Sequence, residues 1–350
     1  MIKERKMVTC FLCACGMMAL ILDSKIAIAG ASDGIEICLR TVIPSLFPFF
    51  VLSILLTSTV SGSNIAVFRP LEKLCGIPEG AGHVLLIGLL GGYPVGAQTV
   101  ALAYDNKDLS KQEAHRLLGF CNNAGPAFIF GVAGSLFTSR TTVFLLWIIH
   151  VVSSLIVAAI LPGKTIRKCT IKEVQPISLS QAMSKSIRIL SGVCGWIILF
   201  RIVIAFLNRW LLWMLPEEAR LLTIGAMELA NGCSFLMQTQ SEAIRFRICS
   251  VILAFGGLCV GMQTATVTRK LGTGWYFPGK ILQTVFSYLL SALVSTFLLE
   301  DAVLSVSIFA TAVLIACAFI ICKKTVAFFD KCVYNKRERK EPAYAVSKEN

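Results

Sequence analysis

The chain has 350 residues, of which 56% are hydrophobic and only 15% are charged, and its mean hydropathy is +0.75. About 25% of the residues in soluble globular proteins are charged, so this composition excludes an ordinary soluble globular chain. The net charge of +13 could indicate a nucleic-acid partner in a soluble protein, but here most of the excess lies beside apolar stretches. We interpret it as a signal of membrane topology and expect no nucleic-acid partner.

Apolar stretches of bilayer length recur along the chain. A helix needs ~20 residues to cross the hydrocarbon core of a membrane. The composition therefore predicts an all-α polytopic membrane protein, embedded in the lipid bilayer, with about eight transmembrane helices plus re-entrant or broken helices. The uncharged stretches that carry this prediction are 44–68, 84–104, 117–139, 141–161, 248–268, 281–299 and 302–322.

Residues 1–31 are predicted to form either the first membrane helix, as a signal anchor, or a cleavable signal peptide. A basic segment precedes an apolar run, and the small residues at 27–29 resemble a cleavage site. An uncleaved anchor accounts for the same pattern. The stretch that follows, with Glu36 and Arg40 before Pro44, is predicted to be a short amphipathic helix at the membrane interface.

Basic residues gather in three regions: the N-terminus, a linker at 163–187 and a tail at 323–350. Lys and Arg beside membrane spans favour the cytoplasmic side, so we expect all three regions in the cytoplasm. Pro176 and the alternating polar residues of the linker argue against a membrane span there.

A short motif occurs twice, because residues 91–99 align with 256–264 as G-G-x-x-V-G-x-Q-T. After each copy come a charged loop and a cation followed by two apolar residues, at Arg116 and at Lys280. Transporters often consist of two related halves with the substrate site between them. We therefore predict two membrane repeats, at 32–162 and 188–322.

Counting the membrane spans predicts that the two repeats are inverted, with opposite orientations in the membrane, the first starting outside and the second inside. For the linker to return to the cytoplasm, residues 115–137 must make no net crossing, and the turn signal at 122–126 favours a re-entrant hairpin. Strict symmetry would make 278–299 re-entrant as well and place the tail outside. We follow the charge rule for the tail instead.

Polar and helix-breaking residues within apolar stretches form the candidate substrate site. Polar groups are costly in hydrocarbon and therefore indicate function. A broken helix presents N–H groups and a positive dipole end, which suit an anionic or polar substrate. The candidate substrate-binding residues are Gly92, Pro94, Gly96, Gln98, Asn122, Asn123, Gly125, Pro126, Arg201, Glu228, Asn231, Gly257, Gly261 and Gln263.

These residues also have structural interpretations. Glycines let membrane helices pack closely, and Arg201 could pair with Glu228. For His150, an interhelical hydrogen bond is favoured over a proton relay. The fourteen cysteines lie mostly in apolar stretches and are interpreted as small apolar fillers, without disulfides or a metal site.

Enzyme motifs are absent from the sequence: it has no Walker loop, no H-E-x-x-H, no G-x-S-x-G and no paired carboxylates at useful spacing. We therefore expect no catalytic residue, metal or cofactor. The lack of an ATP site favours a secondary transporter, a facilitator or a channel with a small-molecule substrate.

Four segments together resemble the sporulation integral membrane protein branch (YlbJ type) of the nucleoside-recognition, or Gate, domain family. They are GYPVGA at 92–97, FCNNAGPAFI at 120–129, MELANG at 227–232 and FGGLCVGMQ at 255–263. The resemblance covers about residues 30–322. It implies a multi-pass protein of a spore-forming Firmicute, made in the mother cell and placed in the membrane around the forespore.

The same resemblance implies transport of dipicolinate, a small aromatic dicarboxylate, towards the developing spore. Another organic anion or a nucleoside is an alternative substrate. A non-transporting structural protein of spore assembly is the alternative from a different class, in which the glycines only pack helices. Homo-oligomers or other sporulation membrane proteins are expected as further partners.

Overall fold

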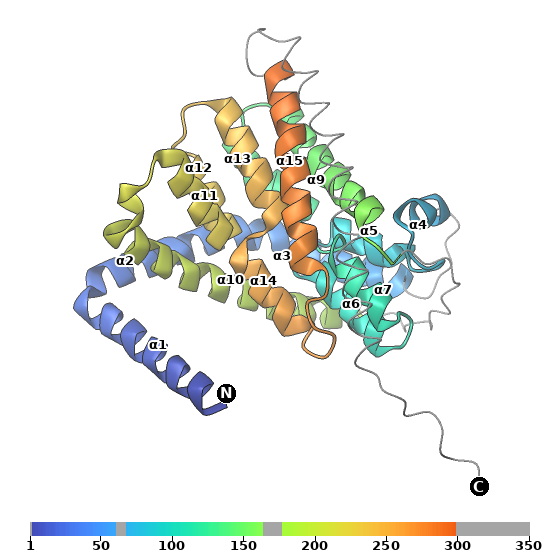
Figure 1. Ribbon diagram of the computed structural model, residues 1–350, viewed down its shortest axis with the longest axis horizontal. Coiled ribbons are helices and arrows are strands. Elements are labelled where there is room, and N and C mark those ends of the chain that lie inside the picture. The colour runs from blue at the N-terminus through green and yellow to red at the C-terminus, as the bar shows by residue number, and fades with distance from the viewer. Residues whose placement is uncertain (1, 61–67, 164–176, 299–350) are drawn as a thin grey trace, which may run out of the picture.

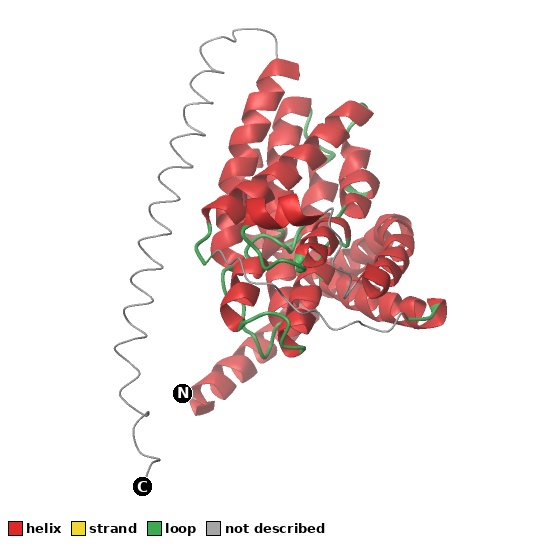
Figure 2. Cartoon of the chain, turned by 90° about the vertical axis from the view of Figure 1, so that its right-hand side faces the viewer, coloured by secondary structure: helices red, strands yellow, loops and turns green. Residues whose placement is uncertain are grey.

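The computed structural model describes residues 2–60, 68–163 and 177–298, and within these ranges the chain is helical with no strand (Figure 2). The all-α prediction is confirmed. Five helices of the described residues are long and apolar enough to cross a membrane: Ser24–Leu56, Arg140–Ile160, Leu179–Trp210, Glu242–Val267 and Tyr276–Ser295. The predicted count of about eight is not reached in these ranges, and the predicted span 302–322 and tail 323–350 lie outside them.

The described helices, in chain order, are α1 (Ile2–Leu22), α2 (Ser24–Ile37), the π-helix η1 (Cys38–Val42), α3 (Ile43–Val60), α4 (Arg69–Cys75), α5 (Gly82–Leu90), α6 (Val95–Asp105), α7 (Lys111–Leu118), α8 (Pro126–Gly131), the 3-10 helix η3 (Ala133–Leu136), α9 (Arg140–Ile160), α10 (Leu179–Trp210), the 3-10 helix η4 (Leu212–Met214), α11 (Glu217–Met227), α12 (Leu229–Leu236), α13 (Glu242–Phe255), α14 (Gly257–Val267) and α15 (Tyr276–Leu298).

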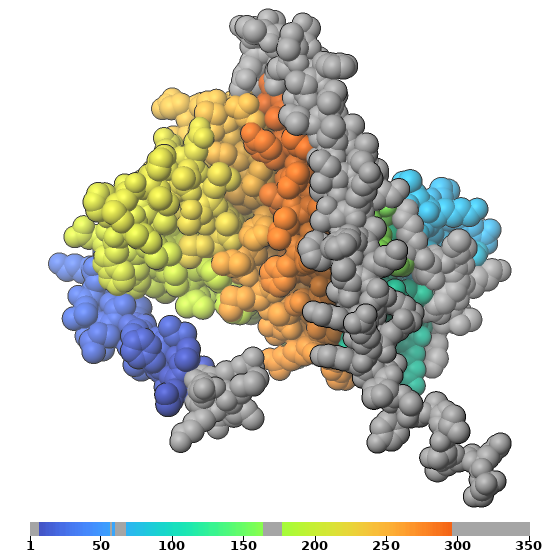
Figure 3. All heavy atoms as spheres, in the orientation of Figure 1, coloured from blue at the N-terminus to red at the C-terminus, as the bar shows by residue number. Residues whose placement is uncertain are grey.

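The first two predicted elements have different boundaries in the structure. The predicted helix at 1–31 is interrupted at Asp23, and α1 lies at one edge of the molecule with most of its side chains exposed (Figures 1 and 3). The predicted interfacial helix before Pro44 is wrong, because α2, η1 and α3 continue as one helical path. That path packs along α10, since Gly30 and Gly34 let the two helices approach closely.

Helices α9, α13 and α15 stand side by side as the upright bundle of Figure 1. Small polar residues join α13 to α15, where the hydroxyls of Ser250 and Ser287 lie 2.7 Å apart and both side chains are buried. Such residues allow close packing between membrane helices and satisfy one another's hydrogen bonds. Helix α15 runs unbroken to Leu298, so the re-entrant segment that strict symmetry would require at 278–299 is not found.

The predicted linker at 163–187 is shorter in the structure. Helix α10 begins at Leu179, where Ser178 Oγ accepts a hydrogen bond from Gln181 N and Gln181 Oε1 accepts one from Ser178 N. This reciprocal capping satisfies N–H groups at the helix start. The second membrane segment therefore starts within the stretch that the sequence assigned to the linker.

Each copy of the repeated motif contains a helix break. The predicted span 84–104 consists of two short helices, α5 and α6, separated at residues 91–94, and α13 is separated from α14 at Gly256. The segment predicted as a hairpin is likewise divided into α7 and α8 by a non-helical loop around residues 121–125. These interruptions bring non-helical backbone into the centre of the molecule, where it is buried in protein.

Candidate functional site

The two helix breaks contact each other directly. The Tyr93 hydroxyl, from the first break, donates to the carbonyl of Leu253 at 3.2 Å, in the last turn of α13 before the second break. Gly256 has a φ of +79°, and a Cβ there would lie 2.9 Å from the Tyr93 hydroxyl. Glycine is required at this position for both its left-handed backbone and its lack of a side chain. The motif copies thus form one interface.

A cavity of about 40 Å³ lies beside this interface. A few waters fill such a volume, whereas small-molecule pockets usually measure about 300–1,000 Å³. The described helices would have to separate to admit a substrate of ordinary size. The lining residues are Val42, Leu46, Phe50, Gly91, Gly92, Tyr93, Ala124, Gly125, Ala127, Phe128, Val193, Ile197, Glu228, Leu229, Val260 and Gln263.

Four predicted site residues meet at this cavity: Gly92, Gly125, Glu228 and Gln263. They come from both motif copies, from the loop before α8 and from the N-terminus of α12, although 165 residues separate the copies in sequence. The Gln263 amide donates to Cys259 Sγ at 3.2 Å and its side chain is buried. The walls are otherwise mostly apolar, so a few polar groups face a hydrophobic space, as in many ligand sites.

Glu228 occupies the N-terminus of α12. One carboxylate oxygen accepts from Ala230 N at 3.0 Å, and the other accepts from Asn231 N at 2.6 Å and from Asn231 Nδ2 at 2.8 Å. Only 3% of its surface is exposed. A helix N-terminus stabilises a negative charge, so these contacts explain why a carboxylate is tolerated there. Asn231, a predicted site residue, therefore supports Glu228 and does not line the cavity.

Asn122 occupies the N-terminus of α6 in a similar way. Its Oδ1 accepts from Ala97 N at 3.2 Å, and its Nδ2 donates to Thr264 Oγ1 of α14 at 2.9 Å. The sequence predicted that the second half of a broken helix would offer its N–H groups to a substrate. In the structure, protein side chains already accept from N–H groups at the starts of both α6 and α12.

Lys280 forms a buried polar cluster behind Tyr93. Its Nζ donates to Tyr93 OH at 3.1 Å, to Asn123 Oδ1 at 3.2 Å and to Gln283 Oε1 at 2.7 Å. The lysine is fully buried. Gln283 also donates to Asn123 Oδ1 at 3.1 Å and to the His150 carbonyl at 3.3 Å. The cluster links α15 and α9 to the first helix break and to the loop before α8.

The loop at 120–125 is fixed by side chains of α9. His150 Nε2 accepts from Ala124 N at 3.1 Å, and Ser154 donates to the Phe120 carbonyl at 2.8 Å. His150 therefore makes the interelement hydrogen bond that the sequence favoured. Asn123 donates to Phe120 O at 2.7 Å and to Ser154 Oγ at 3.2 Å, so its amide group is fully engaged within the protein.

Arg201 lies away from the cavity. Its guanidinium forms an ion pair with Asp33 of α2 at 2.8 Å and stacks over the Phe235 ring at 4.6 Å from the centroid. The predicted alternative partner, Glu228, is instead engaged at the start of α12. The structure thus places Arg201 at the contact between α2 and α10.

The remaining predicted residues form the surroundings of the site. Gln98 is half-buried on α6 and is not among the residues that line the cavity. Pro94 and Pro126 lie at the starts of α6 and α8, where a missing N–H costs little. Gly96, Gly257 and Gly261 fit against other segments: Gly96 against Cys121, Gly257 against Met227 and Glu228, and Gly261 against Phe277.

Sequence reasoning missed Tyr93, Lys280 and Gln283 as site residues. For Lys280 the signal was its match with Arg116 in the repeat. A cation at the same place in both halves indicates a shared role, as the paired amides Gln98 and Gln263 do. The two cations are used differently. Arg116 donates to the backbone carbonyls of Gly76 and Ala158, whereas Lys280 donates to side-chain oxygens of neutral residues.

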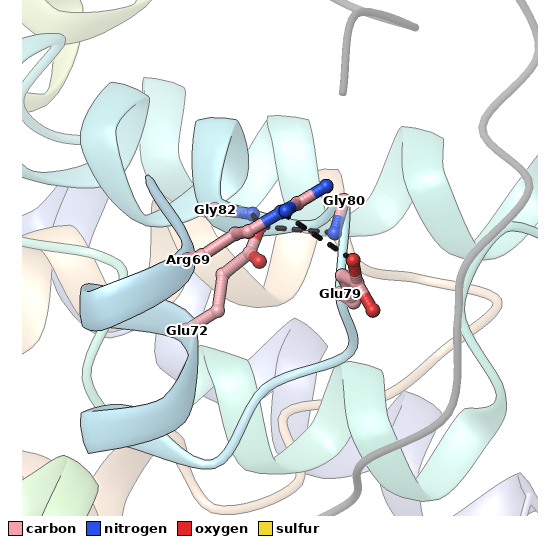
Figure 4. A network of polar contacts seen from close by, with 5 residues as sticks. All are labelled: Arg69, Glu72, Glu79, Gly80 and Gly82. Carbon is pink, nitrogen blue, oxygen red and sulfur yellow. Dashed lines mark hydrogen bonds and ion pairs between the residues drawn. The ribbon is translucent and has the colours of Figure 1, made fainter. Parts of the chain in front are cut away.

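A second buried glutamate lies apart from the cavity, in the region shown in Figure 4. Glu72 Oε1 accepts from Gly80 N and Gly82 N, both at 2.9 Å, while Arg69 pairs with Glu79 at 3.5 Å beside it. Like Glu228, Glu72 lies in a segment that precedes a copy of the repeated motif. Both carboxylates accept backbone N–H groups, which indicates a shared role in fixing local backbone.

Comparison with curated proteins finds one informative relative. The chain is 27% identical over 307 residues to the sporulation integral membrane protein YlbJ of Bacillus subtilis, and the match covers 73% of this chain and 74% of that protein. No family model matches the chain, and no solved structure matches it.

This similarity supports the resemblance to the sporulation integral membrane branch that the sequence motifs suggested. Together with the five long apolar helices, it identifies the chain as a membrane protein. The link to the wider nucleoside-recognition (Gate) domain family stays a prediction from those motifs.

Proposed function

We propose that this chain is a permease that moves a small organic anion, dipicolinate, across the outer forespore membrane into the developing spore. The observation that carries the transport proposal is the cavity beside the contact between two helix breaks, each from one copy of the repeated motif. Broken helices that meet at a central site are typical of secondary transporters, because the breaks supply polar groups within the membrane.

The small volume of the cavity supports an alternating mechanism. A space of about 40 Å³ holds no dicarboxylate, so transport requires the elements around Tyr93 and Gly256 to separate. Non-helical backbone at both breaks provides places where such a movement can occur without disrupting long helices. We expect an open state in which this cavity connects to one side of the membrane.

Sporulation enters the proposal through the similarity to the Bacillus relative, and dipicolinate enters it through the family resemblance. The cavity chemistry is compatible with an aromatic ring, because Phe50, Tyr93 and Phe128 contribute to its walls. Aromatic rings gain from such contacts beyond simple burial. The mother-cell or outer forespore membrane is the proposed location, and other copies or sporulation membrane proteins are proposed partners.

Uptake into proteoliposomes tests the permease directly. Vesicles that contain the full chain should accumulate labelled dipicolinate above protein-free vesicles. Gln263→Ala removes a cavity amide and should lower uptake at least threefold, whereas Gln98→Ala, the matched change at the equivalent motif position, should alter it little. The proposal is overturned if wild-type vesicles take up neither dipicolinate nor uridine.

Spore composition provides the physiological test. In a Bacillus subtilis strain that lacks the relative, spores should contain more dipicolinate when this chain is expressed in the mother cell than when it is not. Unchanged dipicolinate content, with the protein present in the membrane, would contradict the proposed substrate.

The same variants separate the alternatives. A nucleoside permease would transport uridine in preference to dipicolinate. A structural protein of spore assembly would transport neither and would tolerate Gln263→Ala. Enlarging Gly92 or Gly257 does not discriminate, because both have positive φ and would be strained by any side chain.

A further inference from the structure

We infer that Lys280 supplies the positive charge that pairs with a carboxylate of the substrate, with Tyr93 as the group that the carboxylate displaces. The inference deepens the proposed function and rests on it. It assigns the recognised chemistry, a carboxylate on a small organic molecule, to a pair of residues outside the predicted set.

The positive charge of Lys280 has neutral hydrogen-bond acceptors as its neighbours. Its ammonium donates to a phenol and two amides, and among the described residues no carboxylate forms an ion pair with it. Buried charges are normally paired, because neutral acceptors compensate only part of the desolvation cost. A buried ammonium held by neutral oxygens is therefore ready to gain a charged partner.

Tyr93 connects this ammonium to the cavity. The phenol accepts from Lys280 at 3.1 Å, its ring lies 5.2 Å from Nζ, and Tyr93 also lines the cavity. A carboxylate that approaches along the cavity therefore meets Tyr93 first. Because a carboxylate adds charge–charge attraction to the hydrogen bond and a neutral phenol does not, the carboxylate would replace the phenol as an acceptor of Lys280.

That replacement would also act on the contact between the helix breaks. Tyr93 donates to the carbonyl of Leu253 and packs against Gly256. If Tyr93 moves to admit the carboxylate, the first break loses its hydrogen bond to α13. Binding of an anion would thus favour the separation of the breaks that transport requires, since a ligand shifts a conformational equilibrium through its preference for one state.

Calorimetric titration of the full-length protein in detergent tests this assignment. The probes are dipicolinate, with two carboxylates, and uridine, with none. Lys280→Gln should weaken dipicolinate binding about tenfold to a hundredfold, as expected for loss of a charge-assisted hydrogen bond, and leave any uridine binding unchanged. Lys280→Arg should recover part of the affinity. Lys270→Gln, which removes an exposed lysine, is the matched control.

A second variant retains the lysine. Gln283→Glu places a carboxylate beside Lys280, where Gln283 Oε1 now accepts at 2.7 Å. This change supplies an internal ion pair and should weaken dipicolinate binding at least tenfold while the ammonium remains. Thermal melting of each variant verifies that the fold is present.

The outcomes separate the two proposals. Wild-type dipicolinate binding that both folded variants retain at full strength overturns the role of Lys280 and leaves the permease in place. Wild-type protein that binds neither probe overturns both proposals. Loss of dipicolinate binding in Lys280→Gln and Gln283→Glu, but not in Lys270→Gln, supports the assignment.

Discussion

Individual polar residues in this protein are satisfied by partners on distant segments. Asn122 joins α6 to α14, Tyr93 joins the first break to α13, and Lys280 joins α15 to the loop before α8. An unpaired polar group is costly inside a membrane protein, so each of these side chains fixes the position of two elements at once. Residues that the sequence suggested as substrate ligands therefore include several that hold the site together.

Asn122 provides a test of this role. Asn122→Ala leaves Ala97 N and Thr264 Oγ1 without their buried partner, so the free energy of unfolding should fall by about 1–3 kcal/mol. The measurement is the melting temperature of the purified protein in detergent. The control is Asn106→Ala, which changes an exposed asparagine directly after α6, the helix whose N-terminus Asn122 caps. Equal melting temperatures for the two variants would contradict the structural role.

Helices α2 and α10 pair through small residues and an ion pair. Gly30 and Gly34 of α2 fit against α10, and the Arg201–Asp33 pair lies on the same contact. The sequence placed Arg201 among the candidate ligands because it interrupts an apolar run. The structure gives that charge a partner on another helix, which is the usual reason for an intramembrane arginine that does not bind substrate.

Arg201 should therefore affect stability more than transport. We expect Arg201→Gln to leave the KM for dipicolinate within twofold of wild type. A double-mutant cycle with Asp33→Asn should give a coupling of about 0.2–1 kcal/mol, the range for exposed pairs, because Asp33 is 53% exposed. Thermal melting and vesicle uptake supply the two measurements. A large rise in KM would instead return Arg201 to the substrate site.

The molecule as a whole consists of helix groups that meet at non-helical backbone. The upright bundle of α9, α13 and α15 (Figure 1) meets the first helix break at Tyr93, and α10 packs along α2 and α3. The cavity is lined by α3, α8, α10, α12 and α14 together with the first helix break and the loop before α8, so its size depends on their relative positions. A larger side chain in one wall of the cavity should lower transport while the outer surface of the protein stays unchanged.

Val260→Phe tests whether this cavity lies on the transport path. Val260 is buried and lines the cavity on α14, whereas Leu258 of the same helix is 49% exposed. The larger ring should fill the remaining space and lower dipicolinate uptake at least tenfold, while Leu258→Phe should have little effect. Both variants must reach the membrane in equal amounts, as judged by immunoblot. Normal uptake by Val260→Phe would place the path elsewhere.

The sequence by itself determined the membrane class, the helical architecture and the positions of the helix breaks. These properties depend on local composition: apolar length sets a span, and adjacent glycines within an apolar run, as at residues 91–92 and 256–257, favour a helix break. Repeat matching also found Gln263, and the search for polar residues in apolar stretches found Glu228; both reach the cavity.

Only the tertiary structure decided which polar groups meet. Tyr93 and Lys280 are 187 residues apart, and Asn122 and Thr264 are 142 apart, so no local pattern could pair them. The continuation of α2 into α3 was also decided by packing against α10, which outweighed the signals for an interfacial helix at Glu36 and Arg40. Hydrogen-bond partners depend on where segments pack, and packing is a property of the whole chain.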